Sequence, residues 1–304
     1  MLTQLVDAYL AVRRTGGFGL KQTEGYLRRF AEFATARGEQ HVRVVTAVAW
    51  ATQASTADAR RRRLQPLVIF ARYLRAEDPG HEIPPGGCFA RSGHRPLPHI
   101  YSPDEARRLV QAAVRCGPAG SIVPHALTTL LALIFASGLR ISEALALRFG
   151  DITPDGLVIR QTKFRKTRLV PLHPTAAEGL SRYLDRRRAA ASTSDHVFIN
   201  SFGTPLSYKA VQSRWHRILA DADILRGQGI RGGPRIHDIR HTFAVRALES
   251  APGQRDRIAR HMLAVSTYLG HAHVADTYWY LQATPTLMSG VADTCQHHFE
   301  GGRP

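Results

Sequence analysis

Six residues of types that can act together on a phosphodiester lie in the second half of the chain. A phosphodiester has an anionic phosphoryl centre, so cleaving it without a metal requires cations at the non-bridging oxygens, a nucleophile and an acid for the leaving oxygen. Arginine suits the first task, because its planar fork binds two oxygens at once and stays charged. A tyrosine hydroxyl, with an ordinary pKa of about 10, attacks when nearby cations favour its anion. The six are Arg140, Lys163, His237, Arg240, His271 and Tyr280.

The local sequence predicts which elements carry the arginines. Arg140 follows Gly138, a break between an apolar helix and an amphipathic helix through Glu143, so its side chain is expected at a helix start. His237 and Arg240 are three residues apart, a spacing that puts both on one face of a helix. Histidine can carry protons near neutral pH, because its unperturbed pKa is about 6.5.

Residues 162–172 alternate charged and apolar residues up to Pro171, which predicts a β-hairpin with residues 164–167 at its tip. Only four lysines occur in the chain, and two of them, Lys163 and Lys166, fall in this hairpin. A specific use for an ammonium group there is therefore expected.

The composition indicates a polyanionic partner. The 304 residues carry 41 basic against 24 acidic side chains, a formal net charge of +17, which makes nucleic acid the leading candidate. Neither an uncharged apolar run of about 18 residues nor a signal peptide is evident, which predicts a cytoplasmic protein. Cys88, Cys116 and Cys295 form an odd, widely spaced set that supports neither a disulfide framework nor a four-cysteine zinc site.

Apolar periodicity, helix caps and Pro- and Gly-rich segments predict two domains. Apolar periodicity gives four helices in the first eighty residues, the fourth capped by Ser55 and kinked or split by Pro66. A Pro- and Gly-rich linker follows, and Ser102 opens a second domain with a capping box. There we expect helices near 126–137 and through Glu143, short strands near 157–161 and 168–172, and then helices. The run Arg60, Arg61, Arg62 and Arg63 is either a solvated face or a phosphate contact, with equal weight.

Four segments together resemble the tyrosine recombinases, the phage-type integrases. They read ASGLRISEALALRFGDI, TKFRKTRLVPL, IHDIRHTFAVRAL and TYLGHAHVADTYWY, in the order and at the intervals of that family, and the resemblance extends over about 98–288. It implies a mainly α fold with a small antiparallel β-sheet (α+β), in a two-domain C-shaped DNA clamp. A helical core-binding domain would span 1–85, a linker 86–98 and a catalytic domain 99–304, with a C-terminal tail from about 289.

The resemblance also implies roles. Arg140 and Arg240 would clamp the phosphate with His271, while His237 would accept the tyrosine proton. The family places its nucleophile nine residues after the histidine of the Leu-Gly-His motif, which selects Tyr280.

By the same resemblance, Tyr278 would be a packing residue. Counting back from Arg168 favours Lys163 over Lys166 as the acid for the 5′ oxygen, and Lys166 would then contact backbone phosphate or solvent. His241 is expected to support the site from behind or to be structural, and His273 to be an ordinary exposed residue.

The implied reaction is strand cleavage and rejoining of double-stranded DNA through a 3′-phosphotyrosine, without cofactor or metal, in a tetramer on paired sites. An integrase or transposase of a mobile element is preferred, with a chromosome or plasmid dimer resolvase as the alternative. Residues after Met288 would exchange between protomers. Ser250–Gln254 departs from the family by breaking a helix where relatives often continue one.

Other classes fit the chain less well. His237 and His241 have the spacing of a zinc helix, but the intervening Asp-Ile-Arg lacks the metalloprotease glutamate and puts Arg240 beside the metal. A magnesium nuclease would need a cluster of carboxylates that the sequence does not show. A catalytically silent DNA-binding regulator would lack at least one catalytic group, and a type IB topoisomerase fits the Leu-Gly-His context less well.

Overall fold

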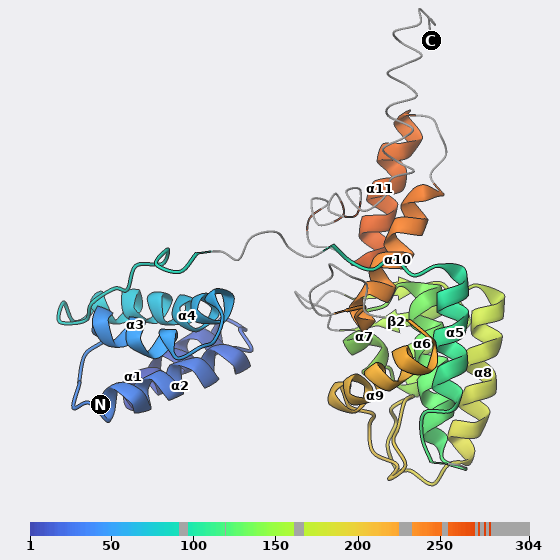
Figure 1. The fold of residues 1–304 in the computed structure, drawn as a ribbon, viewed down its shortest axis with the longest axis horizontal. Helices are drawn as coiled ribbons and strands as arrows, with labels where there is room; N and C mark the ends of the chain where they lie inside the picture. The colour runs from blue at the N-terminus through green and yellow to red at the C-terminus, as the bar shows by residue number, and fades with distance from the viewer. Residues whose placement is uncertain are drawn as a thin grey trace, which may run out of the picture. The chain divides into compact units, whose positions relative to one another are not determined.

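The computed structural model describes residues 1–90, 97–118, 120–160, 167–224, 233–250, 255–270, 273, 277 and 280, with side chains from 260 onward in the helix that begins at 255. The chain divides into two compact units, Met1–Arg95 and Pro96–Pro304 (Figure 1). The described part is mostly helical with one small antiparallel sheet, so the predicted fold class is confirmed. Within it, no helix is both long enough and apolar enough to span a membrane.

The N-terminal unit consists of four helices, as predicted. Their apolar faces meet in one core, which includes the fully buried Phe30 and Phe70. Ile83 and Phe89, further along the chain, also pack against this core, so part of the Pro- and Gly-rich stretch folds onto the unit. The helices are α1 (Leu2–Thr15), α2 (Lys21–Thr35), α3 (Val44–Thr52) and α4 (Ala57–Arg75).

Two details of α4 narrow or correct the prediction. Of the kink or split expected at Pro66, the split does not occur, because Pro66 lies inside one uninterrupted helix. Proline removes the bond to the carbonyl four residues earlier, that of Arg62, but Arg62 is exposed, where water can supply the missing donor. The cap is also one residue later than expected: the Thr56 side chain, not that of Ser55, accepts from the backbone N–H of Ala59, at 3.2 Å.

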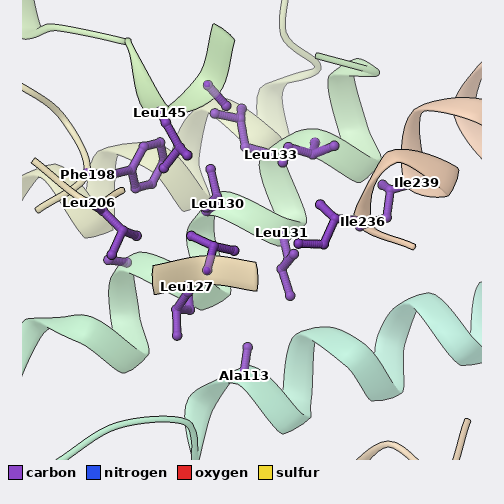
Figure 2. Packing of buried hydrophobic residues seen from close by; sticks show 14 of the residues in the cluster. Ala113, Leu127, Leu130, Leu131, Leu133, Leu145, Phe198, Leu206, Ile236 and Ile239 are labelled. Carbon is purple, nitrogen blue, oxygen red and sulfur yellow. The ribbon is translucent and has the colours of Figure 1, made fainter. Parts of the chain in front are cut away.

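The C-terminal unit is built around one apolar helix, α6. Figure 2 shows Leu127, Leu130 and Leu131 of this helix among apolar side chains from several other elements, including Ile236 and Ile239. The helices of the unit are α5 (Pro103–Val114), α6 (Ile122–Ser137), α7 (Ile141–Leu145), the 3-10 turn η1 (Phe149–Asp151), α8 (Pro174–Ala189), α9 (Tyr208–Asp221), α10 (Ile236–Glu249) and α11 (Arg255–Leu269).

The capping box at Ser102 is confirmed. The Ser102 hydroxyl accepts from the Glu105 N–H at 3.0 Å, and the Glu105 carboxylate accepts from the Ser102 N–H at 2.7 Å. The break predicted at 250–254 also agrees with the described helices, since α10 ends at Glu249 and α11 begins at Arg255.

The sheet has three short antiparallel strands in the order β1 (Ile152–Thr153), β2 (Gly156–Ile159) and β3 (Arg168–Val170). The two predicted strands correspond to β2 and β3, whereas β1 was not foreseen because two residues carry no periodicity. Ile159 pairs with Arg168, so β3 begins opposite the end of β2. Strand β3 also packs against α11, which brings the start of the strand to the end of that helix.

Candidate active site

Arg140 is placed by the abrupt end of α6. Gly138 caps this helix in the left-handed conformation, with φ of +61°, and a side chain there would collide with the Phe243 ring. The chain then turns into α7, for which Arg140 is the N-cap residue. Glu143 completes the turn by accepting from the backbone N–H of Arg140 at 3.0 Å. The prediction of a helix start after a glycine break is therefore confirmed.

Arg240 lies on α10, whose first turn is fixed by Asp238. This buried carboxylate accepts from the Arg235 backbone N–H at 2.9 Å and also binds its guanidinium, at 2.8 Å. The Arg240 side chain is only 2% exposed, and its Nη1 donates to the carbonyl of Gly138 at 2.8 Å. Its guanidinium thus contacts the same glycine break that orients Arg140.

Three arginines from three different elements bind three successive carbonyls at the end of α11. Nε of Arg168 donates to the Tyr268 oxygen at 2.9 Å, and Nη2 of Arg240 donates to the Leu269 oxygen at 2.6 Å. Nη2 of Arg140 donates to the Gly270 oxygen at 3.4 Å. The last carbonyls of a helix have no intrahelical partner and carry partial negative charge, so they attract cations. The end of α11 therefore gathers the cations of the site.

Arg168 and Glu143 belong to the site but were not among the predicted residues. Glu143 is almost completely buried and binds both arginines: Arg168 through both of its oxygens, at 3.1 and 2.8 Å, and Nη1 of Arg140 at 2.7 Å. Burial alone would raise the pKa of Glu143, but hydrogen bonds from Arg168 and from the Arg140 backbone outweigh it and lower the pKa to about 2. Glu143 is therefore a carboxylate at every working pH.

Tyr280 packs against α10. It is 4% exposed and belongs to an apolar cluster with Ala244, Leu248 and Leu269. On α10, His237, His241, Ala244 and Leu248 follow one another at spacings of three or four and so share one face. The His241 ring lies 5.2 Å from the Tyr280 ring and 4.6 Å from the His237 ring, centroid to centroid.

His241 is buried and lies between His237 and Tyr280, a position that fits both of the expected roles, support of the site from behind and a structural role.

The surroundings shift two pKa values in the same direction. Burial and the neighbouring charge of Arg140 lower the pKa of Arg240 to about 10, and Tyr280 and Glu143 oppose this. Arg240 therefore remains charged at pH 7. Partial desolvation and the charge of Arg240 lower the pKa of His237, although the ring remains accessible to water. His237 is consequently neutral at pH 7 and able to accept a proton.

The structure thus brings together Arg140, Arg240, His237 and Tyr280 of the six predicted residues. The other two, Lys163 and His271, lie outside the described residues, as do Lys166 and Tyr278. His273 is exposed, as expected.

The arginine run on α4 is only partly directed to solvent. Arg60 donates through Nε to the Ala54 carbonyl at 2.9 Å, and Arg63 donates to the Trp50 carbonyl at 3.4 Å. Arg61 lies 3.8 Å from the Asp58 carboxylate. Of the four, Arg62 alone is exposed. Two of the arginines therefore help to hold α4 against the segment that ends α3.

In the described part of the chain, the one group of side chains close enough to share a metal ion is His41, Asp78 and His81, in the N-terminal unit. Nδ1 of His81 accepts from the backbone N–H of Val42 at 3.0 Å. Its Nε2 therefore carries the proton when the ring is neutral, and it points to Asp78 at 3.7 Å. Metal ligands normally have the opposite arrangement, so this cluster is a structural hydrogen-bond network.

Clustered arginines, a neutral histidine and a buried tyrosine on a helical fold with one small sheet define the class of the tyrosine recombinases. Comparison with known proteins agrees: residues 100–286 match the model of the phage integrase family. The chain is 36% identical over 311 residues to the putative integrase/recombinase y4rB of Sinorhizobium fredii, covering 98% of each chain. It is 30% identical over 256 residues to the tyrosine recombinase XerC of Pseudomonas syringae pv. syringae, covering 84% of this chain and 79% of XerC.

Among solved structures, a lambda integrase tetramer bound to a Holliday junction superposes with a TM-score of 0.66 at 18% identity, over 92% of this chain and 76% of the integrase. The chain belongs to the phage integrase family, whose members are tyrosine-type site-specific recombinases. The resemblance found in the four sequence segments is thereby confirmed.

Proposed function

We propose that this protein cleaves and rejoins DNA strands through a covalent 3′-phosphotyrosine, with Tyr280 as the nucleophile. The observation that carries the proposal is the packing of Tyr280 against α10, in the apolar cluster beside His241 and within electrostatic reach of Arg240. Arg240 in turn shares the end of α11 with Arg140. One chain thus supplies both the nucleophile and the cations for the phosphate.

In the proposed reaction the Tyr280 oxygen attacks the scissile phosphorus while the bond from phosphorus to the 5′ oxygen breaks. Arg140 and Arg240 stabilise the negative charge that builds up on the non-bridging oxygens. His237, neutral at pH 7, takes the tyrosine proton. The released 5′-hydroxyl of another strand can attack the phosphotyrosine in turn, so strand exchange needs no external energy source.

The roles of two further residues are proposed from the sequence motifs. Lys163 is proposed to protonate the 5′ leaving oxygen, and His271 to donate to a non-bridging oxygen of the phosphate. Support for both comes from the described residues that flank them: Arg168 follows Lys163 by five positions, and Gly270 immediately precedes His271. Both flanking residues belong to the arginine and carbonyl cluster.

The proposed partner is double-stranded DNA, bound through the high positive charge of the chain, with the helical unit as the core-binding domain and residues after 288 as the segment exchanged between protomers. A tetramer on paired sites is proposed, and the tetrameric assembly of lambda integrase supports it. The site of action would be the cytoplasm, on the nucleoid.

We propose a role in a mobile element, as an integrase or transposase, because two relatives that align along nearly the whole chain are putative integrase/recombinases. A dimer resolvase is the second candidate, favoured by the similarity to XerC.

The experiment captures the covalent intermediate. Wild type, Tyr280→Phe and Tyr278→Phe are expressed in cells that carry the native genomic neighbourhood of the gene, the cells are denatured, and protein-linked DNA is isolated and sequenced. Adducts lost in Tyr280→Phe and retained in Tyr278→Phe are expected, and the attached sequences identify the DNA site. Loss of the adducts in Tyr278→Phe alone would assign the nucleophile to Tyr278. Absence of adducts in wild type would favour a catalytically silent DNA-binding regulator.

A further inference from the structure

Arg168 is the one arginine of the cluster to which neither the sequence motifs nor the proposed chemistry gives a task. It begins β3, its side chain is 13% exposed, and both of its terminal nitrogens face Glu143. Its remaining nitrogen, Nε, is bound to the Tyr268 carbonyl at 2.9 Å. The fork of Arg168 thus binds both oxygens of a carboxylate of its own chain, whereas Arg140 gives that carboxylate one side-chain donor and is the more exposed of the two, at 26%.

Glu143 connects Arg168 to the proposed clamp. The same carboxylate accepts from Nη1 of Arg140 at 2.7 Å. A carboxylate at this distance, with no second cation, would pair with Arg140 and cancel much of its attraction for an anion. Arg168 supplies that second cation, and it does so through two hydrogen bonds in the fork geometry that guanidinium and carboxylate favour.

We propose that Arg168 is a positioning residue that neutralises Glu143 and so leaves Arg140 with an uncompensated positive charge for the scissile phosphate. The inference rests on the proposed function and assigns a task to a residue outside the predicted set of six. It explains why a nearly buried carboxylate is present beside a site for an anion: Glu143 fixes the backbone and side chain of Arg140, and Arg168 cancels its charge.

The balance of charge supports this assignment. Glu143 is ionised at every working pH, because its pKa lies at about 2, and the described cations that face it are Arg140, Arg168 and, further away, Arg240. Counted over these described groups alone, three cations and one carboxylate leave a net charge of about two, and removing Arg168 halves it. Removing Glu143 together with Arg168 restores the original balance.

The test compares Arg168→Gln with the double variant Glu143→Gln/Arg168→Gln. The rate of strand cleavage is measured in a single turnover with saturating protein, on the DNA site recovered from the wild-type adducts. We expect Arg168→Gln to cleave about 100-fold more slowly than wild type and the double variant to regain at least about tenfold. Cleavage by the double variant no faster than by Arg168→Gln would overturn the inference.

Three controls separate a charge effect from a fold effect. Arg148→Gln breaks an exposed arginine and carboxylate pair of 2.7 Å elsewhere in the same unit and should cleave like wild type. Hydrogen exchange of the α6 amides establishes that each variant is folded at the assay temperature. Should Arg168→Gln fail to fold, Arg168→Lys keeps the charge and should cleave within about tenfold of wild type. A loss of 100-fold in folded Arg168→Lys would contradict a role through charge.

A substrate with sulfur in place of the 5′ bridging oxygen tests whether Arg168 acts on the phosphate clamp or on the leaving group. A thiolate leaves without a proton, so this substrate restores variants that lack the general acid. The defect of Arg168→Gln should persist on it, and full recovery would assign Arg168 to the leaving group.

A second readout does not depend on catalysis. Inorganic phosphate is titrated into four proteins, namely wild type, Arg168→Gln, Glu143→Gln and the double variant, and the arginine Nε–H resonances are followed by NMR. Phosphate should bind Arg168→Gln more weakly than the double variant. Equal binding by wild type and Arg168→Gln would refute the inference, whereas absence of adducts in wild type would refute only the proposed function.

Discussion

Replacing Gly138 by alanine tests how the end of α6 places the site. Gly138 has φ of +61°, and an added Cβ would collide with the Phe243 ring. Its carbonyl accepts from Arg240, and Arg140 follows two residues later. The substitution therefore disturbs the backbone that carries one arginine and binds the other, without removing any catalytic side chain.

The expected destabilisation is the sum of two effects. A residue other than glycine in the left-handed conformation costs about 1–2 kcal/mol, and forcing a methyl group into a packed ring costs about 1–3 kcal/mol more. We therefore expect Gly138→Ala to lower the free energy of unfolding of the C-terminal unit by about 2–5 kcal/mol. Gly120→Ala is the matched control, because Gly120 has φ of +71° but no atom within 4 Å of the added Cβ. Gly120→Ala should lose only the about 1–2 kcal/mol that the left-handed conformation costs.

The assay is hydrogen exchange of the α6 amides as a function of urea, since these amides report the C-terminal unit and not the N-terminal helices. Combining Gly138→Ala with Phe243→Ala removes the collision, and the effect of the glycine change should then fall to that of Gly120→Ala. Equal destabilisation by the two glycine variants in the presence of Phe243 would refute the packing argument. Strand cleavage by Gly138→Ala should also fall, because both arginines shift.

Three further results are expected. Because the folded-state pKa of Glu143 is depressed to about 2, its contribution to stability is complete above pH 4.5 and is lost between pH 4.5 and 2. Over this range the free energy of unfolding of wild type, measured with urea, should fall by about 3 kcal/mol more than that of Glu143→Gln. An equal fall in the two proteins would contradict the prediction. The lowered pKa of His237 keeps its ring neutral, so the cleavage rate should stay constant from pH 8 to 6, whereas an ordinary histidine would give half the rate at about pH 6.5. The fall of log affinity for DNA with log salt should become less steep by about one in Arg62→Ala, because Arg62 is exposed. It should remain unchanged in Arg60→Ala, whose side chain is held by the Ala54 carbonyl. The reverse result would assign the DNA contact to Arg60.

Local signals in the sequence were sufficient for much of the scaffold. Ser102 and Glu105 form a box within one turn, and the glycine at 138 interrupts an apolar run, so both helix boundaries could be predicted from neighbouring residues. The sequence left a kink and a split open at Pro66, because the effect of proline on a helix depends on whether water reaches the orphaned carbonyl, and exposure is a property of the tertiary structure.

The pairing of Arg168 with Glu143 could not be predicted from either residue alone. The two are 25 positions apart, and Glu143 by itself indicates only the first turn of a helix. The side chain of Arg168 is only 13% exposed, and a guanidinium buried to this degree requires a partner, but its burial is a property of the folded structure. The binding of the arginines to the carbonyls of residues 268–270 could not be predicted from side-chain types, because every residue has a carbonyl.

The end of α11 explains how several like charges can be held close together before DNA arrives. Each of the three arginines gives at least one donor to a carbonyl there, and the partial negative charge of that helix end offsets part of their mutual repulsion. The offset is incomplete, since burial and Arg140 still lower the pKa of Arg240 to about 10. A phosphate entering the site would supply the missing negative charge, and the donors are already oriented by carbonyls and by Glu143. Little reorganisation is then needed as charge develops on the phosphate, which is the condition under which fixed cations accelerate a reaction most.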